Sequence, residues 1–241
     1  MSVVRCCESA EELRREVAAH VVREASGRSP FVVAVSGGSM PTALSGLLDV
    51  DMNGWDVVFA DERLVSLDSP DSNYKACMDA LFARAPRPPR VHAVDVTRAP
   101  EAAAAAYDEK FRSLGGKVHL ALLGAGPDGH TASLFPGHPL FVGDDDGRLV
   151  RCITDSPKPP PERVTLTRTA LAAADSVVYV ATGASKADLF AQLFRRKTGD
   201  DGTVSFVDSE PPLLPVARVR AKDGSATFFV DAPALAKVPS A

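Results

Sequence analysis

The chain has 241 residues, of which 45% are apolar and 24% are charged, and its formal net charge is −4. This composition suits an α/β fold with a buried core, and we expect a single domain over residues 1–241. No apolar run reaches the roughly 18 residues that a membrane-spanning helix needs. No basic face is evident either, so the sequence argues against membrane and nucleic-acid partners.

The N-terminal segment and the cysteines indicate a cytoplasmic protein. Residues 1–16 carry charges early and lack the apolar core of a secretion signal. Cys6, Cys7, Cys77 and Cys152 form no C-x-x-C pair, and adjacent cysteines are a poor start for a disulfide framework. We therefore expect free thiols in a reducing compartment.

Helices and short apolar strands alternate along the chain. Ser9 and Glu12 fit a capping box that opens a helix over residues 9–25. Residues 31–35 form a continuous apolar run, which is typical of a strand buried on both faces, and Pro41 opens the next helix. Further strands are expected at 55–60, 118–123, 163–167, 176–181 and 226–230, and further helices at 72–84, 101–114, 171–174 and 187–197.

Strand, glycine-bearing loop and helix follow one another several times, which predicts a mainly parallel sheet covered by helices. Ligands bind such sheets beyond the carboxyl ends of the strands. Four loops follow strands here, at residues 36–39, 61–63, 124–131 and 182–186. If the sheet is parallel, all four loops converge on one edge.

Two of these loops suit an anion. Gly37, Gly38 and Ser39 lie between a buried strand and a helix, where glycine allows close approach and the helix start offers free N–H groups. The pattern is neither a dinucleotide-binding nor a Walker loop, and a tight turn without a ligand is an alternative. Lys186 lies near another helix start, where an anion would offset the unfavourable helix dipole, although a solvated lysine would look the same.

The other two loops carry groups suited to catalysis. Arg63 can bind a carboxylate, a phosphate or a developing oxyanion with two hydrogen bonds, or can form an internal ion pair. His130 can take a proton from water near neutral pH, and Asp128 can orient its ring or bind the substrate. A metal site built from Asp128, His130 and His138 has no familiar ligand spacing, so we expect none.

Lys158 and Arg163 flank a stiff run of three prolines that can hold both basic groups in place. A polar connector without a ligand is the alternative reading. His20, His92 and His119 have no supporting context, and we expect structural roles for them.

Six segments of the chain together resemble the 6-phosphogluconolactonase family, within the wider glucosamine-6-phosphate isomerase/lactonase fold. They are SGGS at 36–39, DERLV at 61–65, SNY at 72–74, LGAGPDGHTASLFPGHP at 123–139, SPKPPPERVTLT at 156–167 and ATGASKA at 181–187. The GPDGHT-x-SLFPGHP stretch is highly specific, and the order and spacing of the others agree.

The resemblance implies a Rossmann-like α/β fold and hydrolysis of 6-phospho-D-glucono-1,5-lactone in the pentose phosphate pathway. It implies that residues 36–39 and Lys186 hold the phosphate, with help from basic residues near 158–163, and that His130 activates water without a cofactor. The isomerase branch carries an acidic residue a few positions after this histidine. Here Leu134, Phe135 and Pro136 stand in that place, which makes isomerisation or deamination a weaker alternative. A sugar-phosphate sensor without catalysis is the other alternative.

Overall fold

The computed structural model describes residues 2–143, 146–199, 201–209 and 213–241. Its centre is a seven-stranded sheet in the order β1-β12-β9-β6-β2-β3-β5, and every pairing within it is parallel. Its strands are β1 Ser2–Cys7, β2 Phe31–Val35, β3 Trp55–Phe59, β5 Arg90–His92, β6 Leu120–Gly124, β9 Ser176–Ala181 and β12 Ala226–Asp231. The prediction of a mainly parallel sheet flanked by helices is confirmed.

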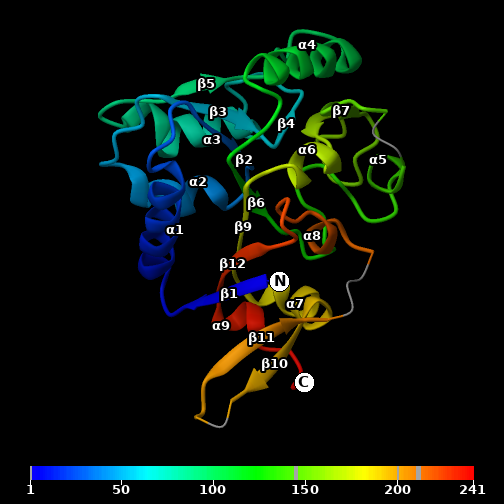
Figure 1. The fold of residues 1–241 in the computed structure, drawn as a ribbon. Coiled ribbons are helices and arrows are strands. Elements are labelled where there is room, and N and C mark those ends of the chain that lie inside the picture. Colours follow the sequence, from blue (N-terminus) through cyan, green and yellow to red (C-terminus); the bar gives the residue numbers. More distant parts are fainter. Residues whose placement is uncertain (1, 144–145, 200, 210–212) are drawn as a thin grey trace.

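Helices cover both faces of the sheet (Figure 1). The helices of four or more residues are α1 Ala10–Ala25, α2 Met40–Ala43, η1 Leu44–Leu47, α3 Asn73–Ala80, α4 Pro100–Ser113, α5 Pro139–Val142, α6 Arg168–Ala172, α7 Ala187–Leu193, α8 Pro215–Arg218 and α9 Ala232–Leu235. Two three-residue turns, η2 Phe82–Arg84 and η3 Ala184–Lys186, complete the set. None of the described helices is long and apolar enough to cross a membrane.

Strand β2 explains why two separate apolar cores form. Phe31, Val33 and Val35 pack into the core beneath α1 and η1, whereas Val32 and Ala34 pack into the core that holds α4 and α6. Successive strand residues point to opposite faces, so a strand covered on both sides must be apolar throughout. This is the pattern that the continuous run at 31–35 predicted.

The first helix begins as predicted, with one difference in its cap. The hydroxyl of Ser9 accepts a hydrogen bond from the Glu12 N–H at 3.1 Å. The Glu12 carboxylate, however, accepts from the N–H of Glu8 at 2.7 Å and not from that of Ser9. The box therefore closes one residue earlier than expected.

The prediction of a helix continuing to residue 197 is wrong. Helix α7 ends at Leu193, and β10 Phe194–Thr198 pairs antiparallel with β11 Val204–Asp208. This hairpin extends away from the main sheet (Figure 1). Strand β1, at the edge of the main sheet, was also not predicted.

A second small sheet frames the functional edge. It contains β4 Asp61–Arg63, β8 Arg163–Leu166 and β7 Val150–Ile153, all antiparallel. The predicted strand at 163–167 therefore exists but does not join the main sheet. Its pairing places Arg63 opposite Arg163, at the point where the chain leaves β3.

Candidate active site

A cavity of about 210 Å³ opens at the carboxyl ends of β2, β6 and β9. It is lined by Ser36, Gly37, Gly38, Ser39, Asp61, Arg63, Gly124, Ala125, Gly126, Pro127, His130, Ala132, Arg163, Val180 and Lys186. All four loops expected to converge contribute to this wall. The parallel sheet brings together a histidine, a lysine and a glycine-rich turn, and the small antiparallel sheet adds two arginines.

The turn at 36–39 gives one wall of the cavity. Gly38 has φ +67°, which favours glycine. Gly37 leaves no room for a side chain, because a Cβ there would overlap the amide of Asn73. The hydroxyl of Ser36 is buried and finds no hydrogen-bond partner among the described residues. A buried polar group without a partner is costly, so this hydroxyl is suited to bind a polar ligand.

His130 is held by its own loop. The Gly126 N–H donates to the His130 carbonyl at 2.9 Å, and the Thr131 hydroxyl donates to the Gly124 carbonyl at 2.8 Å. The imidazole packs on Phe135, with ring centroids 4.8 Å apart. The loop thus fixes the ring, whose side chain remains 19% exposed.

Asp128 contacts the His130 ring, which is the geometry that one of the two sequence interpretations requires. Its Oδ1 atom lies 2.5 Å from His130 Nδ1. Burial lowers the pKa of His130 below its ordinary value, and the Asp128 carboxylate acts in the opposite direction. The contacts of Asp128 with His130 and Lys158 lower its own pKa to about 2 despite partial burial, which raises it. An ionised Asp128 favours a proton on Nδ1, and the Nε2 atom is then a base.

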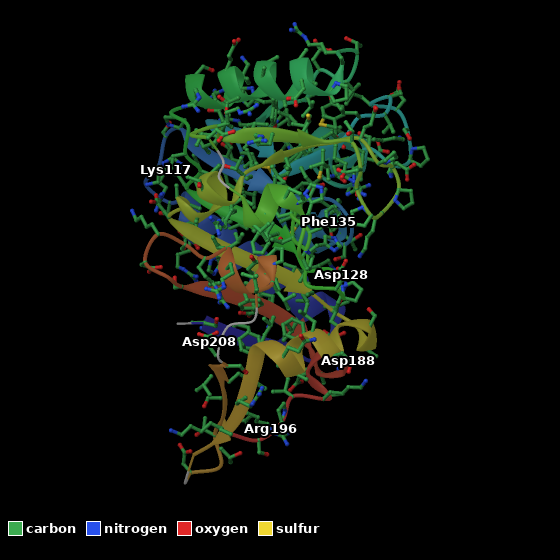
Figure 2. All side chains as sticks on the ribbon, turned by 90° about the vertical axis from the view of Figure 1, so that its right-hand side faces the viewer. Lys117, Asp128, Phe135, Asp188, Arg196 and Asp208 are labelled. Atoms are coloured by element: carbon green, nitrogen blue, oxygen red, sulfur yellow. The ribbon has the colours of Figure 1, made fainter. Side chains whose placement is uncertain are left out.

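Lys158 belongs to the same cluster. Its Nζ atom lies 3.1 Å from Asp128 Oδ2 and 3.2 Å from His130 Nδ1. Asp128 and Phe135, which flank the imidazole, lie in the same part of the molecule in Figure 2. The sequence predicted Lys158 as a substrate-binding cation but gave no sign of its contact with the histidine.

Arg163 is 3% exposed and holds the proline run in place. Its guanidinium donates to the carbonyls of Lys158, Pro159 and Pro160 at 3.0, 3.1 and 3.0 Å. Its Nη1 atom lies 3.8 Å from Asp61 Oδ2. Most of its donors are therefore used within the protein, and a direct bond from Arg163 to phosphate stays a prediction.

Arg63 keeps hydrogen-bonding capacity toward the cavity. Its Nη1 atom donates to the Asp71 carbonyl at 2.8 Å, whereas its buried Nε finds no partner within the described part of the chain. The alternative that the sequence left open for Arg63, an internal ion pair with a neighbouring acid, is absent among these residues. Arg63 can therefore bind an anionic group in the cavity.

Lys186 is a second cavity-lining cation without an ion pair among the described residues. No ion pair of Lys186 is found within residues 2–143, 146–199, 201–209 and 213–241. Burial, followed by the charge of Lys158, lowers the pKa of its ammonium group. Two neighbouring cations that disfavour each other gain from an anion placed between them.

Asp61 is the cavity residue that sequence reasoning did not select. It is 5% exposed and accepts a hydrogen bond from the Ser133 hydroxyl at 2.8 Å. Asp61 directly precedes Glu62 and Arg63, and the predicted strand end at this triplet was its signal. Asp61 and Arg63 line the cavity, whereas Glu62 is fully buried beside it.

His138 does not join His130. Its Nε2 atom lies 3.0 Å from Asp155 Oδ1, and its Nδ1 atom accepts from the Leu140 N–H, which caps α5. Within the part of the chain that the structure describes, no three histidine, cysteine or acidic side chains are grouped as a metal site requires. The arrangement suits acid–base chemistry on an anionic ligand.

The fold and this cavity define an α/β protein with a histidine and three basic side chains at the carboxyl edge of its sheet. The chain belongs to the family of glucosamine-6-phosphate isomerases/6-phosphogluconolactonase, whose model matches residues 7–228. It is 38% identical to "Probable 6-phosphogluconolactonase 3, chloroplastic" of Oryza sativa subsp. indica, over 96% of this chain and 75% of that protein.

Animal and bacterial proteins are similar as well. The 6-phosphogluconolactonase of Rattus norvegicus is 36% identical over 92% of this chain and 88% of its own length. The crystal structure of 6-phosphogluconolactonase from Thermotoga maritima superposes with a TM-score of 0.81 at 27% identity, covering 96% of this chain and all of that one. The expected family resemblance is confirmed.

Proposed function

We propose that this protein hydrolyses 6-phospho-D-glucono-1,5-lactone to 6-phosphogluconate, a step of the pentose phosphate pathway. The observation that carries the proposal is the position of His130. Its ring is oriented by Asp128 at 2.5 Å and shares a cavity with the 36–39 turn and Lys186. The names of its relatives indicate the substrate, and the residues that line the cavity suit its hydrolysis.

The phosphate of the substrate binds beside residues 36–39 and Lys186. Residues 36–39 and Lys186 line the same space, and the N–H groups, hydroxyls and ammonium that they carry suit a phosphate dianion. Lys158 and the Arg163-braced loop add positive charge. Binding a remote phosphate positions C1 of the lactone beside His130.

Hydrolysis then needs one base and one stabiliser of negative charge. The Nε2 atom of His130 takes a proton from water as the water oxygen attacks C1, and the electron pair of the carbonyl moves onto its oxygen. Arg63 or backbone N–H groups stabilise that oxyanion. The carbonyl re-forms, the C1–ring oxygen bond breaks, and His130 returns the proton to the departing ring oxygen. A lactone is already activated, so the proposed mechanism includes no metal or organic cofactor.

Phe135 favours hydrolysis over the isomerase or deaminase alternative. It stands where the isomerase branch has an acid, is 2% exposed, and packs on the His130 ring. A phenyl group cannot carry protons between substrate carbons. Turnover of glucosamine 6-phosphate by the purified protein would contradict this assignment.

The decisive experiment is a coupled assay on freshly made 6-phosphogluconolactone, corrected for spontaneous ring opening. We expect His130→Asn to lower kcat by about a hundredfold or more, with KM little changed because the phosphate wall is intact. The matched control is His138→Asn, which lies outside the cavity and keeps a helix-capping side chain. Equal turnover of the His130 variant and the control would remove His130 from the mechanism.

We place the protein in the cytoplasm, with the sugar-phosphate lactone as its partner and no nucleic acid. The support is the set of four free cysteines and the absence of an obvious basic surface in the sequence. Imaging of the tagged full-length protein tests this location, and enrichment in an organelle would contradict it.

A further inference from the structure

Two neighbours of opposite character compete for one atom of His130. Asp128 Oδ1 lies 2.5 Å from Nδ1, and Lys158 Nζ lies 3.2 Å from the same nitrogen. A neutral imidazole has one N–H and one lone pair, so Nδ1 can donate to the carboxylate or accept from the ammonium, but not both. The ligand-free site therefore supports two tautomers.

Only one tautomer is competent for the proposed reaction. When Nδ1–H donates to Asp128, the lone pair is on Nε2, which can take a proton from water. When the Lys158 ammonium donates to Nδ1, the proton is on Nε2, and that nitrogen cannot act as a base. Interconversion returns one proton to solvent at one ring nitrogen and takes one up at the other, so the net charge is unchanged.

Lys158 has a fixed backbone and a partly exposed side chain that can move. Its backbone is fixed by the Arg163 bond to its carbonyl at 3.0 Å and by two bonds to the Ser156 hydroxyl, at 2.8 and 3.3 Å. Its side chain is 37% exposed, whereas that of Arg163 is 4% exposed. A flexible lysine stem on a fixed loop can turn toward a new anion at little cost.

The new anion is the phosphate of the substrate. The Lys158 ammonium lies 3.2 Å from His130 Nδ1, and His130 lines the cavity together with the 36–39 turn and Lys186. A phosphate dianion there carries more charge than Asp128 alone and therefore competes for the Lys158 ammonium.

We propose that Lys158 is a positioning residue that couples phosphate binding to the tautomer of His130. In the free protein its ammonium shares Nδ1 with Asp128 and holds part of the population in the incompetent tautomer. A bound phosphate draws the ammonium away, Nδ1–H then donates to Asp128 alone, and Nε2 becomes the base. The device rests on the proposed function and makes the site selective for phosphorylated lactones through kcat as well as KM.

The kinetic test separates the phosphate from the lactone. Hydrolysis of unphosphorylated glucono-1,5-lactone is measured with and without inorganic phosphate, and the rate of the His130→Asn variant under the same conditions is subtracted. We expect phosphate to raise the wild-type rate about threefold, the gain for a resting competent fraction of about one third. Lys158→Met is expected to hydrolyse this lactone faster than wild type without phosphate and to gain nothing from it.

The faster resting rate of Lys158→Met is the decisive result, because mere loss of a phosphate ligand cannot produce it. The matched control is Lys110→Met, an exposed lysine of α4, which should behave as wild type. A resting rate of Lys158→Met equal to or below that of wild type overturns the proposal, as does phosphate activation that persists in this variant.

A spectroscopic test needs no Lys158 variant. In protein labelled with ¹⁵N-histidine, inorganic phosphate should move the His130 ring signals toward the tautomer with the proton on Nδ1, and the His130→Asn spectrum assigns those signals. Unmoved His130 signals at saturating phosphate overturn the coupling. If wild type does not open 6-phosphogluconolactone at all, the proposed function fails first, and the coupling fails with it. Normal turnover with no phosphate effect leaves the function intact and removes the coupling alone.

Discussion

Gly126 lies so close to His130 that a methyl group on its Cα would overlap Nδ1 and Cε1 of the imidazole. The same methyl group would lie 2.5 Å from Oδ1 of Asp128. Gly126 therefore provides the space that the His130 and Asp128 side chains occupy, while its N–H donates to the His130 carbonyl. The glycine is required by a close approach and not by its backbone angles.

We expect Gly126→Ala to lower kcat by tenfold to a hundredfold, because the imidazole must shift by about 1 Å. The coupled lactone assay measures the loss. The thermal unfolding of this variant is compared with that of the control Gly124→Ala. A methyl group on Gly124 would meet no atom within 4 Å. Full activity of the Gly126 variant would show that the observed ring position is not the working one.

The pH dependence of turnover should follow His130. Burial and the Lys158 ammonium lower the pKa of His130, Asp128 and Asp61 raise it, and the balance lies below the ordinary value of about 6.5. The imidazole must be neutral to act as a base, so activity is full above its pKa and is lost as the pH falls through it. We expect the acidic limb of kcat/KM below pH 6.5, measured after subtraction of spontaneous hydrolysis.

Asp128→Asn should move this limb to lower pH, because the carboxylate that stabilises the imidazolium is gone. It should also lower kcat by about tenfold or more, because an amide no longer selects one tautomer. Asp155→Asn is the matched control, since Asp155 pairs with His138 outside the cavity. A limb that moves to higher pH in the Asp128 variant contradicts the assigned pairing.

The sequence predicted the elements that depend on local patterns. Residues 31–35 and 176–181 coincide with β2 and β9 because a strand buried on both faces must be apolar throughout. The error at residue 194 has the opposite cause. The run of Leu193, Phe194 and the following basic residues suits a helix, but pairing with β11 converts it to a strand, and no local signal reports a partner strand farther along the chain.

The candidate site likewise has features that follow from local sequence and features that depend on distant parts of the chain. Each of the four loops could be assigned to the carboxyl edge because it follows a predicted strand of a parallel sheet. The contact of Lys158 with His130 spans 28 positions and depends on a separate small sheet and on the Arg163 brace. Asp61 and Arg63 belong to one short motif, and only the folded chain shows that both residues line the cavity.

Glu62, between these two residues, is expected to be essential for stability. It is fully buried, and its carboxylate accepts the N–H groups of Arg63, Asn73 and Tyr74 at 2.7, 2.8 and 2.7 Å. In Glu62→Gln, an NH₂ group replaces one acceptor and faces N–H donors. We expect a loss of about 2–4 kcal/mol in the free energy of unfolding.

Urea unfolding followed by circular dichroism measures this loss. The matched control is Glu109→Gln on the exposed side of α4, which should change the free energy of unfolding by less than about 0.5 kcal/mol. Equal urea midpoints for the two variants would contradict this prediction and would mean that the buried Glu62 carboxylate is replaceable.

Asp175 holds together the amino ends of four strands, at the edge of the sheet opposite the cavity. Its carboxylate lies 2.7 Å from Arg28 Nη1, 2.6 Å from Lys117 Nζ and 2.8 Å from Lys222 Nζ. These four residues precede β9, β2, β6 and β12, which are neighbours in the sheet. Lys117 and Asp128 lie on opposite sides of the molecule in Figure 2, so this cluster stabilises the fold without contacting the cavity.

Asp175→Asn should lower the free energy of unfolding at pH 7 by about 1–2 kcal/mol, because three partly exposed cations lose their shared anion. Hydrogen bonds to the three cations hold the pKa of Asp175 well below its usual range, although burial opposes them. Its contribution is therefore complete above the unfolded-state pKa of about 3.9 and is lost as the pH falls through the lower folded-state value. Urea unfolding at several pH values should show that the difference in the free energy of unfolding between wild type and variant closes below about pH 4.

Asp79→Asn, which breaks one exposed pair with Lys75, is the control and should show a difference near zero at every pH. A difference for Asp175→Asn that stays constant into acid would mean that the carboxylate acts through packing and not through its charge.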